Sequence, residues 1–313
     1  MIETGLDHAE PVARTVALGS FDGVHLGHRR VIESAIAAAA ERGTRSSVVT
    51  FEPHPMVVLR PELAPHELST PQRRSQLVAE LGPDELIVIR FDHAFSQIEH
   101  DQFAERVLHD KLGARLVIVG RNYRYGHRAQ GSIETLAASG QRLGFDVQPA
   151  PLVELDGAPI SSSRIRDLFS AGEVEHAARL LGRAPWLEGV IVRGDGRGRE
   201  LGFATANLES APRSAMPAIG IYAGRAHLPE ESRAAAISVG YNPTFSDERE
   251  RVRVEAHLLD FDRDIYGQSL LIEFMRRLRG EQRFDTVGDL VAQVHRDIDA
   301  VRAEPLVWRP PRL

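Results

Sequence analysis

Two histidines stand three positions apart in the stretch GSFDGVHLGH, which runs from Gly19 to His28. Imidazole N–H groups donate hydrogen bonds to phosphate oxygens, and they do so more strongly when the ring is protonated. Gly27, between the two histidines, lets a phosphate approach the backbone. A helical pattern starts directly afterwards, and a helix N-terminus adds N–H donors and a partial positive charge. The spacing predicts a phosphate site at His25 and His28, with a plain turn carrying two surface histidines as the alternative.

The elements that must position this turn alternate between strand-like apolar runs and helical patterns. Such alternation is typical of an α/β fold, a parallel sheet with helices on its faces. The turn follows the first run, so we expect it at the carboxyl edge of the sheet, where ligands bind in this architecture. The strand-like runs are 12–20, 46–51, 85–91, 114–120 and 145–155, and the helical patterns are 28–43, 70–82, 100–113, 132–144 and one that begins at 161.

Near residue 183 the pattern changes, after the short joint GRAPWLEG. The runs beyond it are strand-like and are separated by turns without helices, which favours an antiparallel barrel or sandwich. The chain closes with a helical pattern over 286–302. We therefore predict two domains, 1–183 and 184–313. The strand-like runs of the second are 186–194, 220–228, 234–240, 252–261 and 269–275.

The composition limits the function classes. The chain of 313 residues has no cysteine, which excludes disulfides, zinc–thiolate sites and iron–sulfur clusters. No apolar run is long enough to cross a bilayer and the N-terminus lacks a signal-peptide pattern, so we predict a cytoplasmic protein without a membrane partner. The formal net charge of −6 argues against nucleic acid as a partner. Lys111 is the only lysine, so a Walker-type loop is excluded and phosphates must be bound by other groups.

Four motifs in the first domain carry a resemblance. GSFDGVHLGH looks like the first signature of the HxGH nucleotidylyltransferases, and ISSSRIR (160–166) looks like their second. TFEPHP (50–55) and VGRNYRYGHRAQG (119–131) resemble the bacterial FAD synthetase branch. The resemblance implies a Rossmann-like domain in which a phosphate attacks the α-phosphorus of ATP and pyrophosphate leaves. Such chemistry needs positioning and charge neutralisation more than a covalent nucleophile.

The resemblance also implies roles for single residues. His25 and His28 would contact the ATP phosphates, and Asn122 would lie near the flavin. Ser162, Ser163 and Arg166 would hold the departing pyrophosphate, with a helix N-cap and a solvated arginine as the alternatives. His54 is interpreted as part of a rigid loop at the rim of the site. The further ATP-binding residues are Gly19, Phe21, Asp22, Gly23 and Gly27.

A second set of motifs lies beyond residue 183. GDGRGRELGFATANL, from 194 to 208, resembles the glycine-rich signature of riboflavin kinases. Backbone N–H groups at Gly196 and Gly198 would face the ATP phosphates. The hydroxyl of Thr205 and the amide oxygen of Asn207 are hard oxygen ligands, suited to Mg²⁺ bridged to those phosphates. A charged hairpin turn is the alternative for the glycine-rich part.

The acid that matches this family is Glu255, in VEAHLLDFDRDIYG (254–267). On a strand, Val254 and Ala256 would point to the opposite face and leave Glu255 on its own side. Its carboxylate would take the proton of a primary hydroxyl that attacks the γ-phosphorus of ATP. A solvent-exposed strand acid is the alternative. Ala204 replaces the family's proline, whose ring would fix the backbone before Thr205, so this chain departs from the family at its metal position.

Together the motifs resemble the bacterial bifunctional riboflavin kinase/FAD synthetase family over nearly the whole chain. The resemblance implies a riboflavin kinase-like barrel that makes FMN and an α/β domain that adenylylates FMN to FAD. ATP, riboflavin and FMN would be the partners, Mg²⁺ the cofactor, and flavins substrates and products. Three alternatives stay open: an FAD synthetase with a weakened or inactive kinase domain, another HxGH transferase with an unrelated barrel, and a regulatory protein that senses flavins or nucleotides.

Overall fold

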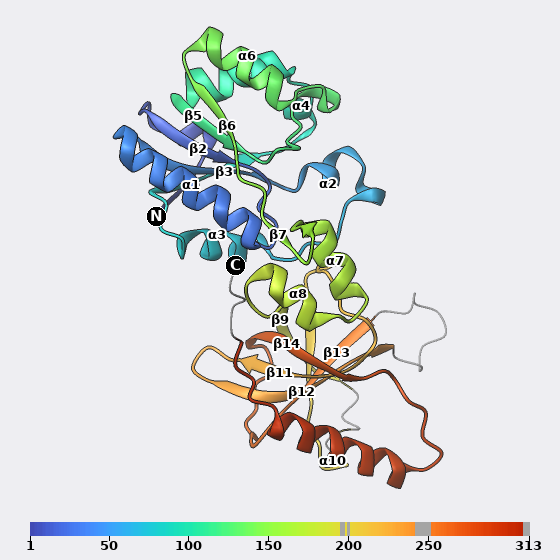
Figure 1. Cartoon of the computed structure of the whole chain (residues 1–313). Helices are drawn as coiled ribbons and strands as arrows, with labels where there is room; N and C mark the ends of the chain where they lie inside the picture. Colours follow the sequence, from blue (N-terminus) through green and yellow to red (C-terminus); the bar gives the residue numbers. More distant parts are fainter. Residues whose placement is uncertain (195–197, 199–200, 242–251, 309–313) are drawn as a thin grey trace. The chain divides into compact units, whose positions relative to one another are not determined.

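The chain folds into two compact units, Met1–Ser161 and Ser162–Leu313 (Figure 1). Each unit has its own hydrophobic core. The predicted boundary at residue 183 falls inside the second unit and stays a prediction. The computed structural model describes residues 1–194, 198, 201–241 and 252–308.

The first unit is built on a six-stranded parallel sheet in the order β1-β4-β3-β2-β5-β6. All five residues of β2 are buried, because a central strand is covered on both faces. The predicted α/β class is thus confirmed. Strand β1 lies outside the predicted strands, since it is short and partly exposed and pairs with β4 only at the sheet edge. The strands are β1 (Ile2–Gly5), β2 (Arg14–Leu18), β3 (Arg45–Glu52), β4 (Glu85–Arg90), β5 (Ala114–Val119) and β6 (Asp146–Pro149).

Helices cover both faces of this sheet (Figure 1). Their ends follow from the sequence: the Thr70 hydroxyl caps α3, Ser132 forms a capping box on α6, and Gly43 ends α1 in the left-handed region. The predicted helix over 100–113 is a short α-helical turn followed by a π-helical segment. The helices are α1 (Leu26–Arg42), α2 (Pro55–Leu59), α3 (Pro71–Ala79), α4 (His93–Ser96), α5 (His100–Gln102), π-helical η3 (Phe103–Lys111) and α6 (Ile133–Leu143), with 3-10 turns η1 (Leu6–His8), η2 (Pro61–Leu63) and η4 (His127–Ala129) and the hairpin β7 (Glu154–Leu155) and β8 (Ala158–Pro159).

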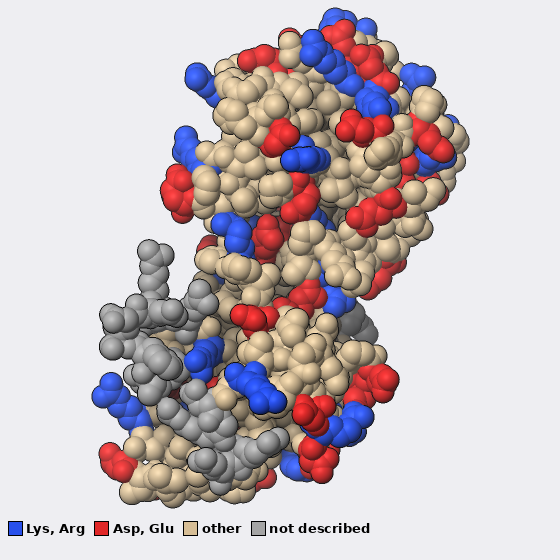
Figure 2. Space-filling view, turned by 180° about the vertical axis from the view of Figure 1, so that it is seen from behind, with Lys and Arg blue, Asp and Glu red and all other residues tan. Residues whose placement is uncertain are grey.

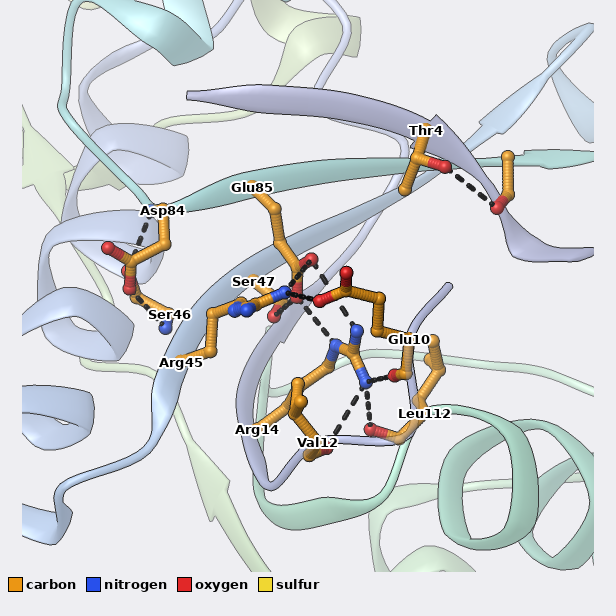
Figure 3. Close-up of polar contacts among 11 residues, drawn as sticks. Thr4, Glu10, Val12, Arg14, Arg45, Ser46, Ser47, Asp84, Glu85 and Leu112 are labelled. Carbon is orange, nitrogen blue, oxygen red and sulfur yellow. Dashed lines mark hydrogen bonds and ion pairs between the residues drawn. The ribbon is translucent and has the colours of Figure 1, made fainter. Parts of the chain in front are cut away.

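A buried ion pair ties the amino-terminal ends of the strands together (Figure 3). Arg14 is 0% and Glu85 is 2% exposed, and the Arg14 Nε donates to Glu85 Oε1 at 2.5 Å. The Ser47 hydroxyl donates to the same oxygen at 2.5 Å, and the Arg14 Nη1 donates to the Leu112 carbonyl at 2.9 Å. A buried charge that loses its partner is costly. This pair therefore stabilises the amino-terminal end of the sheet, opposite the carboxyl end where the site is predicted.

The second unit is a closed barrel of six antiparallel strands in the order β10-β13-β12-β11-β14-β9, so the barrel prediction is confirmed. Tyr222 and Phe274, both 0% exposed, meet edge to face in its core with ring centroids 5.3 Å apart. The strands are β9 (Trp186–Val192), β10 (Ala206–Ser210), β11 (Gly220–His227), β12 (Ser232–Tyr241), β13 (Val252–Leu258) and β14 (Ser269–Arg279).

Helices α7 (Ser162–Ser170), α8 (Val174–Leu181) and α10 (Val287–Ala303) accompany the barrel. The rings of Phe169 and Phe274 lie 5.6 Å apart, which joins α7 to β14. Arg279 of β14 donates to both carboxylate oxygens of Asp297 at 2.8–3.2 Å and so fixes α10 against the barrel. In the described residues, no helix combines the length and the apolar character needed to span a membrane.

Candidate active sites

A cavity of about 870 Å³ opens at the carboxyl end of the parallel sheet. Strand β2 lies between β3 and β5, so the chain leaves it in one direction and later returns on its other side. Ligands bind at such a reversal point in open α/β sheets. Predicted site residues from both sides line this one cavity: Gly19, Phe21, His28 and Asn122.

The two histidines of the first motif have different positions. His25 is 4% exposed and caps α1, because its Nδ1 accepts the backbone N–H of His28 at 3.2 Å. Neutral His25 therefore carries its proton on Nε2, which is the nitrogen left to donate. The two rings are stacked with centroids 3.6 Å apart, and the ring of His28 lines the cavity. Of the two histidines, His28 is thus the one that lines the cavity, and the ring of His25 packs against it.

The glycines of this motif keep the turn tight. A Cβ at Gly27 would lie 3.1 Å from the ring of His25, and a Cβ at Gly19 would lie 3.2 Å from the ring of Phe21. Gly23 has a φ of 77°, which favours glycine. A side chain at Gly19 or Gly27 would thus crowd a neighbouring ring, and a side chain at Gly23 would strain the backbone.

Asp22 has a structural partner in the described chain. It is 3% exposed, and its carboxylate accepts the backbone N–H groups of Leu68 and Ser69 at 2.9 and 3.2 Å. The Ser69 hydroxyl in turn accepts the N–H of Gly23 at 3.0 Å. These bonds hold the turn to the segment before α3. The contact of Asp22 with ATP stays a prediction.

Sequence reasoning missed an aromatic wall in the same cavity. Phe91 lies edge-on to Phe51 and Phe95, with centroids 5.9 and 5.7 Å apart, and Tyr123 is stacked on Tyr125 at 5.8 Å. Burial raises the pKa of Tyr123, so its phenol stays neutral. Aromatic residues end the strand-like runs 46–51 and 85–91 and recur in the 119–131 motif, a pattern that an ordinary core shows as well. The wall comprises Phe51, Phe91, Phe95, Phe103, Tyr123 and Tyr125.

The charges of the cavity have one sign. Among the described residues that line it, none is an aspartate or a glutamate. His54 lines it too, as the rim prediction expects, and its Nδ1 accepts the N–H of Met56 at 3.2 Å, which caps α2. Such a lining favours ligands that carry negative charge. The basic side chains are His28, His54, Arg60, Arg124, His127 and Arg128.

The second signature of the nucleotidylyltransferases lies at the start of α7. Ser162 and Ser163 begin this helix, and the Arg166 guanidinium lies 3.5 Å from the Ser163 hydroxyl. Helix α7 belongs to the second unit. The pyrophosphate-binding role of these three residues therefore stays a prediction.

The barrel carries a second cavity, of about 350 Å³. It is lined by Gly198, Thr205, Glu255 and His257, among others. Glu255 is half-buried between the buried Val254 and Ala256, as the alternation predicts. The Thr205 hydroxyl donates to Glu255 Oε2 at 3.0 Å, so the expected metal ligand and the expected base are in contact.

The described residues fit a magnesium ion that is held mainly by ATP. No cluster of three or more histidine, aspartate or glutamate side chains in the described part of the chain could hold a metal by itself. The hydroxyl of Thr205 and the amide of Asn207 are hard oxygen donors, and Mg²⁺ commonly takes only a few protein ligands beside phosphates. Asn207 pairs with Glu255 in the β10–β13 register, and a Cβ at Gly194 would overlap its amide. Gly196, the other predicted phosphate contact, lies outside the described residues.

Known proteins match the chain along its whole length. The FAD synthetase family matches residues 7–164 and the riboflavin kinase family matches residues 181–304. The bifunctional riboflavin kinase/FMN adenylyltransferase of Listeria monocytogenes is 35% identical over 300 residues, which are 95% of this chain and 94% of that protein. The enzyme of the same name from Bacillus subtilis is 34% identical over 290 residues, 92% of this chain and 91% of that protein.

A solved structure has the same fold. It is the crystal structure of a protein named macrolide-efflux protein from Streptococcus pneumoniae, with a TM-score of 0.86 and 29% sequence identity. The match covers 97% of this chain and 100% of that one. Two family matches in the expected order and full-length relatives above 30% identity lead to one conclusion: the chain belongs to the bifunctional riboflavin kinase/FMN adenylyltransferase family.

Proposed function

We propose that each of the two cavities serves one of the family's two reactions. The enzyme transfers the γ-phosphoryl group of ATP to riboflavin, which gives FMN and ADP, and it then joins FMN to the AMP part of a second ATP, which gives FAD and pyrophosphate. The observation that carries the proposal is that each family match contains one cavity lined by residues of its own motif: Phe21 and His28 in the first, Thr205 and Glu255 in the second.

In the first cavity, a phosphate oxygen of FMN bonds to the α-phosphorus of ATP, and the bond from that phosphorus to the pyrophosphate oxygen breaks. No protein nucleophile is needed, so the site acts by alignment and by stabilising charge on the phosphoryl oxygens. His28 would donate to these oxygens from the cavity wall, and the His25 ring stacked 3.6 Å away would keep it in place. Ser162, Ser163 and Arg166 would bind the leaving pyrophosphate.

The flavin ring system would pack against the aromatic wall. Flat aromatic ligands gain dispersion and hydrophobic contacts from rings placed 4.5–7 Å apart in offset or edge-on geometry, as a general rule. Asn122 lines the same cavity and offers an amide to the polar edge of the flavin. The excess of arginine and histidine supports the simultaneous binding of two anions, ATP and FMN.

In the second cavity, the primary hydroxyl of riboflavin bonds to the γ-phosphorus, the bond to ADP breaks, and Glu255 takes the hydroxyl proton. The Thr205 hydroxyl donates a hydrogen bond to Glu255. The lone pairs of the Thr205 oxygen therefore point elsewhere and can bind a cation. When bound, Mg²⁺ would supply positive charge at the ATP phosphates. Thr205 and Asn207 would hold it, and the backbone at Gly198, together with Gly196, would contact the phosphates.

The proposed partners are therefore ATP, riboflavin and FMN. Nucleic acid does not fit the charge distribution, because the net charge is −6 and Figure 2 shows acidic and basic side chains interspersed over one face of the molecule. A cytoplasmic location and the lack of a membrane partner stay predictions.

The test is to incubate the purified protein with ATP, Mg²⁺ and either riboflavin or FMN, and to separate the flavins by chromatography. We expect riboflavin to give FMN and FAD, and FMN to give FAD. FAD from FMN without any FMN from riboflavin would instead show an inactive kinase domain, the alternative that Ala204 raises. If neither FMN nor FAD forms, both assignments are contradicted.

A further inference from the structure

Two residues that precede β10, Ala204 and Thr205, lie outside the strand pairings that the structure describes. The pairing of β10 with β13 begins at Ala206 opposite Ala256. Ala204 and Thr205 precede this register, yet the hydroxyl of Thr205 must point at Glu255. An alanine at position 204 leaves the backbone torsion open, whereas a proline would fix φ near −65° as a general rule. Contacts other than the strand pairing must therefore fix the backbone at Ala204 and Thr205.

The side chain of His257 provides that hold. Its Nδ1 lies 2.9 Å from the carbonyl oxygen of Ala204. A carbonyl oxygen can only accept, so Nδ1 carries the proton and donates. The ring also meets Phe203 edge-on, with centroids 6.2 Å apart, and the N–H of Phe203 donates to the Gly198 carbonyl at 2.7 Å. The residues on both sides of Ala204 are thus anchored by side chains and by the glycine-rich segment.

We infer that His257 is a positioning residue of the kinase site. By fixing the Ala204 carbonyl it sets the direction of the next residue, Thr205, whose hydroxyl reaches Glu255 at 3.0 Å. His257, Thr205 and Glu255 line the same cavity. The inference rests on the proposed function of this cavity and adds to it: a hydrogen bond from His257 restrains the backbone at Ala204, the position where the resemblance implies a proline.

The experiment compares four proteins in the full chain: wild type, His257→Ala, His257→Asn and the double variant His257→Ala with Ala204→Pro. Asn places an N–H donor close to the position of Nδ1, and proline restores the restraint without any side-chain donor. We expect His257→Ala to lower kcat for FMN formation about tenfold and to raise the Mg²⁺ concentration needed for half-maximal rate, as the loss of supporting contacts around a metal typically does. We expect the KM for riboflavin to change little, and we expect His257→Asn and the double variant each to recover most of the rate.

Two controls accompany these variants. The rate of FAD formation from added FMN, measured on the same samples, should equal that of wild type and shows that each variant is folded in its first unit. His227→Ala removes a barrel histidine that bonds to Glu273 at 2.9 Å and lines neither cavity, and its kinase rate should be unchanged.

Three results would overturn the inference. The first is a wild-type kinase rate in His257→Ala. The second is a double variant and a His257→Asn variant that are both as slow as His257→Ala, because His257 would then act on the substrate rather than on Ala204. The third is a loss confined to the KM for riboflavin. A wild-type protein that makes FAD from FMN but no FMN from riboflavin would instead refute the kinase assignment on which the inference rests.

Discussion

The ring of His28 faces the first cavity and is stacked on His25, whose Nδ1 is occupied by the His28 backbone N–H. Removing the ring removes the proposed donor to the reacting phosphate and leaves the helix cap in place, because the cap uses the backbone N–H of His28. We predict that His28→Ala lowers FAD formation from FMN about 10²–10³-fold, the typical cost of one transition-state donor, and leaves FMN formation from riboflavin unchanged. Chromatography of each reaction measures both rates. The matched control is His109→Ala, which changes a half-buried histidine outside the cavity, and an equal loss in that variant would contradict the role of His28.

Glu255 accepts a hydrogen bond from the Thr205 hydroxyl within the second cavity. Glutamine keeps the size of the side chain and its acceptor oxygen but cannot take a proton from riboflavin. We predict that Glu255→Gln lowers FMN formation about 10²–10⁴-fold, the range of general base catalysis, and leaves FAD formation from added FMN intact. Rates of both steps measured on one sample check this, and a parallel loss of both steps in a folded protein would refute the two-site assignment.

At this scale the sequence predicted Phe21, His28 and Glu255, which line the two cavities, but it did not predict the aromatic wall. The roles of His28 and Glu255 came from motifs that resemble known families and stay predictions. Phe91 and Phe95 are apolar residues of the kind that any core contains. They line the cavity only because the chain that leaves β4 and forms α4 packs beside it. Nothing in the spacing separates such a wall from an ordinary core.

At the scale of elements, the entry to β10 carries Ala204, where the resemblance implies a proline. Ala204 lies before the first pair of the β10–β13 register, and its carbonyl is held by His257. Proline at this position would restrict the backbone further and would leave the carbonyl free to accept the same bond. We predict that Ala204→Pro alone leaves the kinase rate equal or higher, measured as FMN formed from riboflavin. A clear decrease would show that the local backbone depends on alanine.

Most elements could be predicted because their patterns are long. Strands β2 to β5 and helices α1 and α10 lie within a few residues of the predicted ranges, since buried runs and caps such as Thr286 mark their ends. Strand β1 has only four partly exposed residues, and its pairing with β4 is a long-range contact that no local pattern announces. The π-helical segment η3 likewise shares the apolar spacing of an ordinary helix.

At the scale of the molecule, the first unit depends on charges far from its cavity. Arg14 and Glu85 are almost fully buried at the amino-terminal end of the sheet. Glu85→Gln would leave the guanidinium without a buried counter-charge, which typically costs 3–5 kcal/mol. We predict a lower urea midpoint for the loss of FAD formation, with unchanged activity at low urea. Glu62→Gln, which changes a glutamate outside the Arg14 ion pair, is the control; equal midpoints in the two variants would contradict the role of the pair.

The predicted boundary at residue 183 and the division of the structure into Met1–Ser161 and Ser162–Leu313 differ in where they assign the helices between them. The helical patterns before residue 183 are amphipathic, and such a face packs equally well on a sheet or on a barrel. In the structure, contacts such as Phe169 with Phe274 place α7 with the barrel strands. Sequence periodicity shows that a helix has a buried face but not what that face meets.

The central claim is that two independent sites in one chain act in succession, and mixing two variants tests it most directly. His28→Ala and Glu255→Gln are each incubated with riboflavin, ATP and Mg²⁺, alone and as an equimolar mixture, and the flavins are separated. We predict that His28→Ala alone stops at FMN, that Glu255→Gln alone leaves riboflavin unchanged, and that the mixture forms FAD. A mixture without FAD, from variants that each retain their remaining step, would contradict the account.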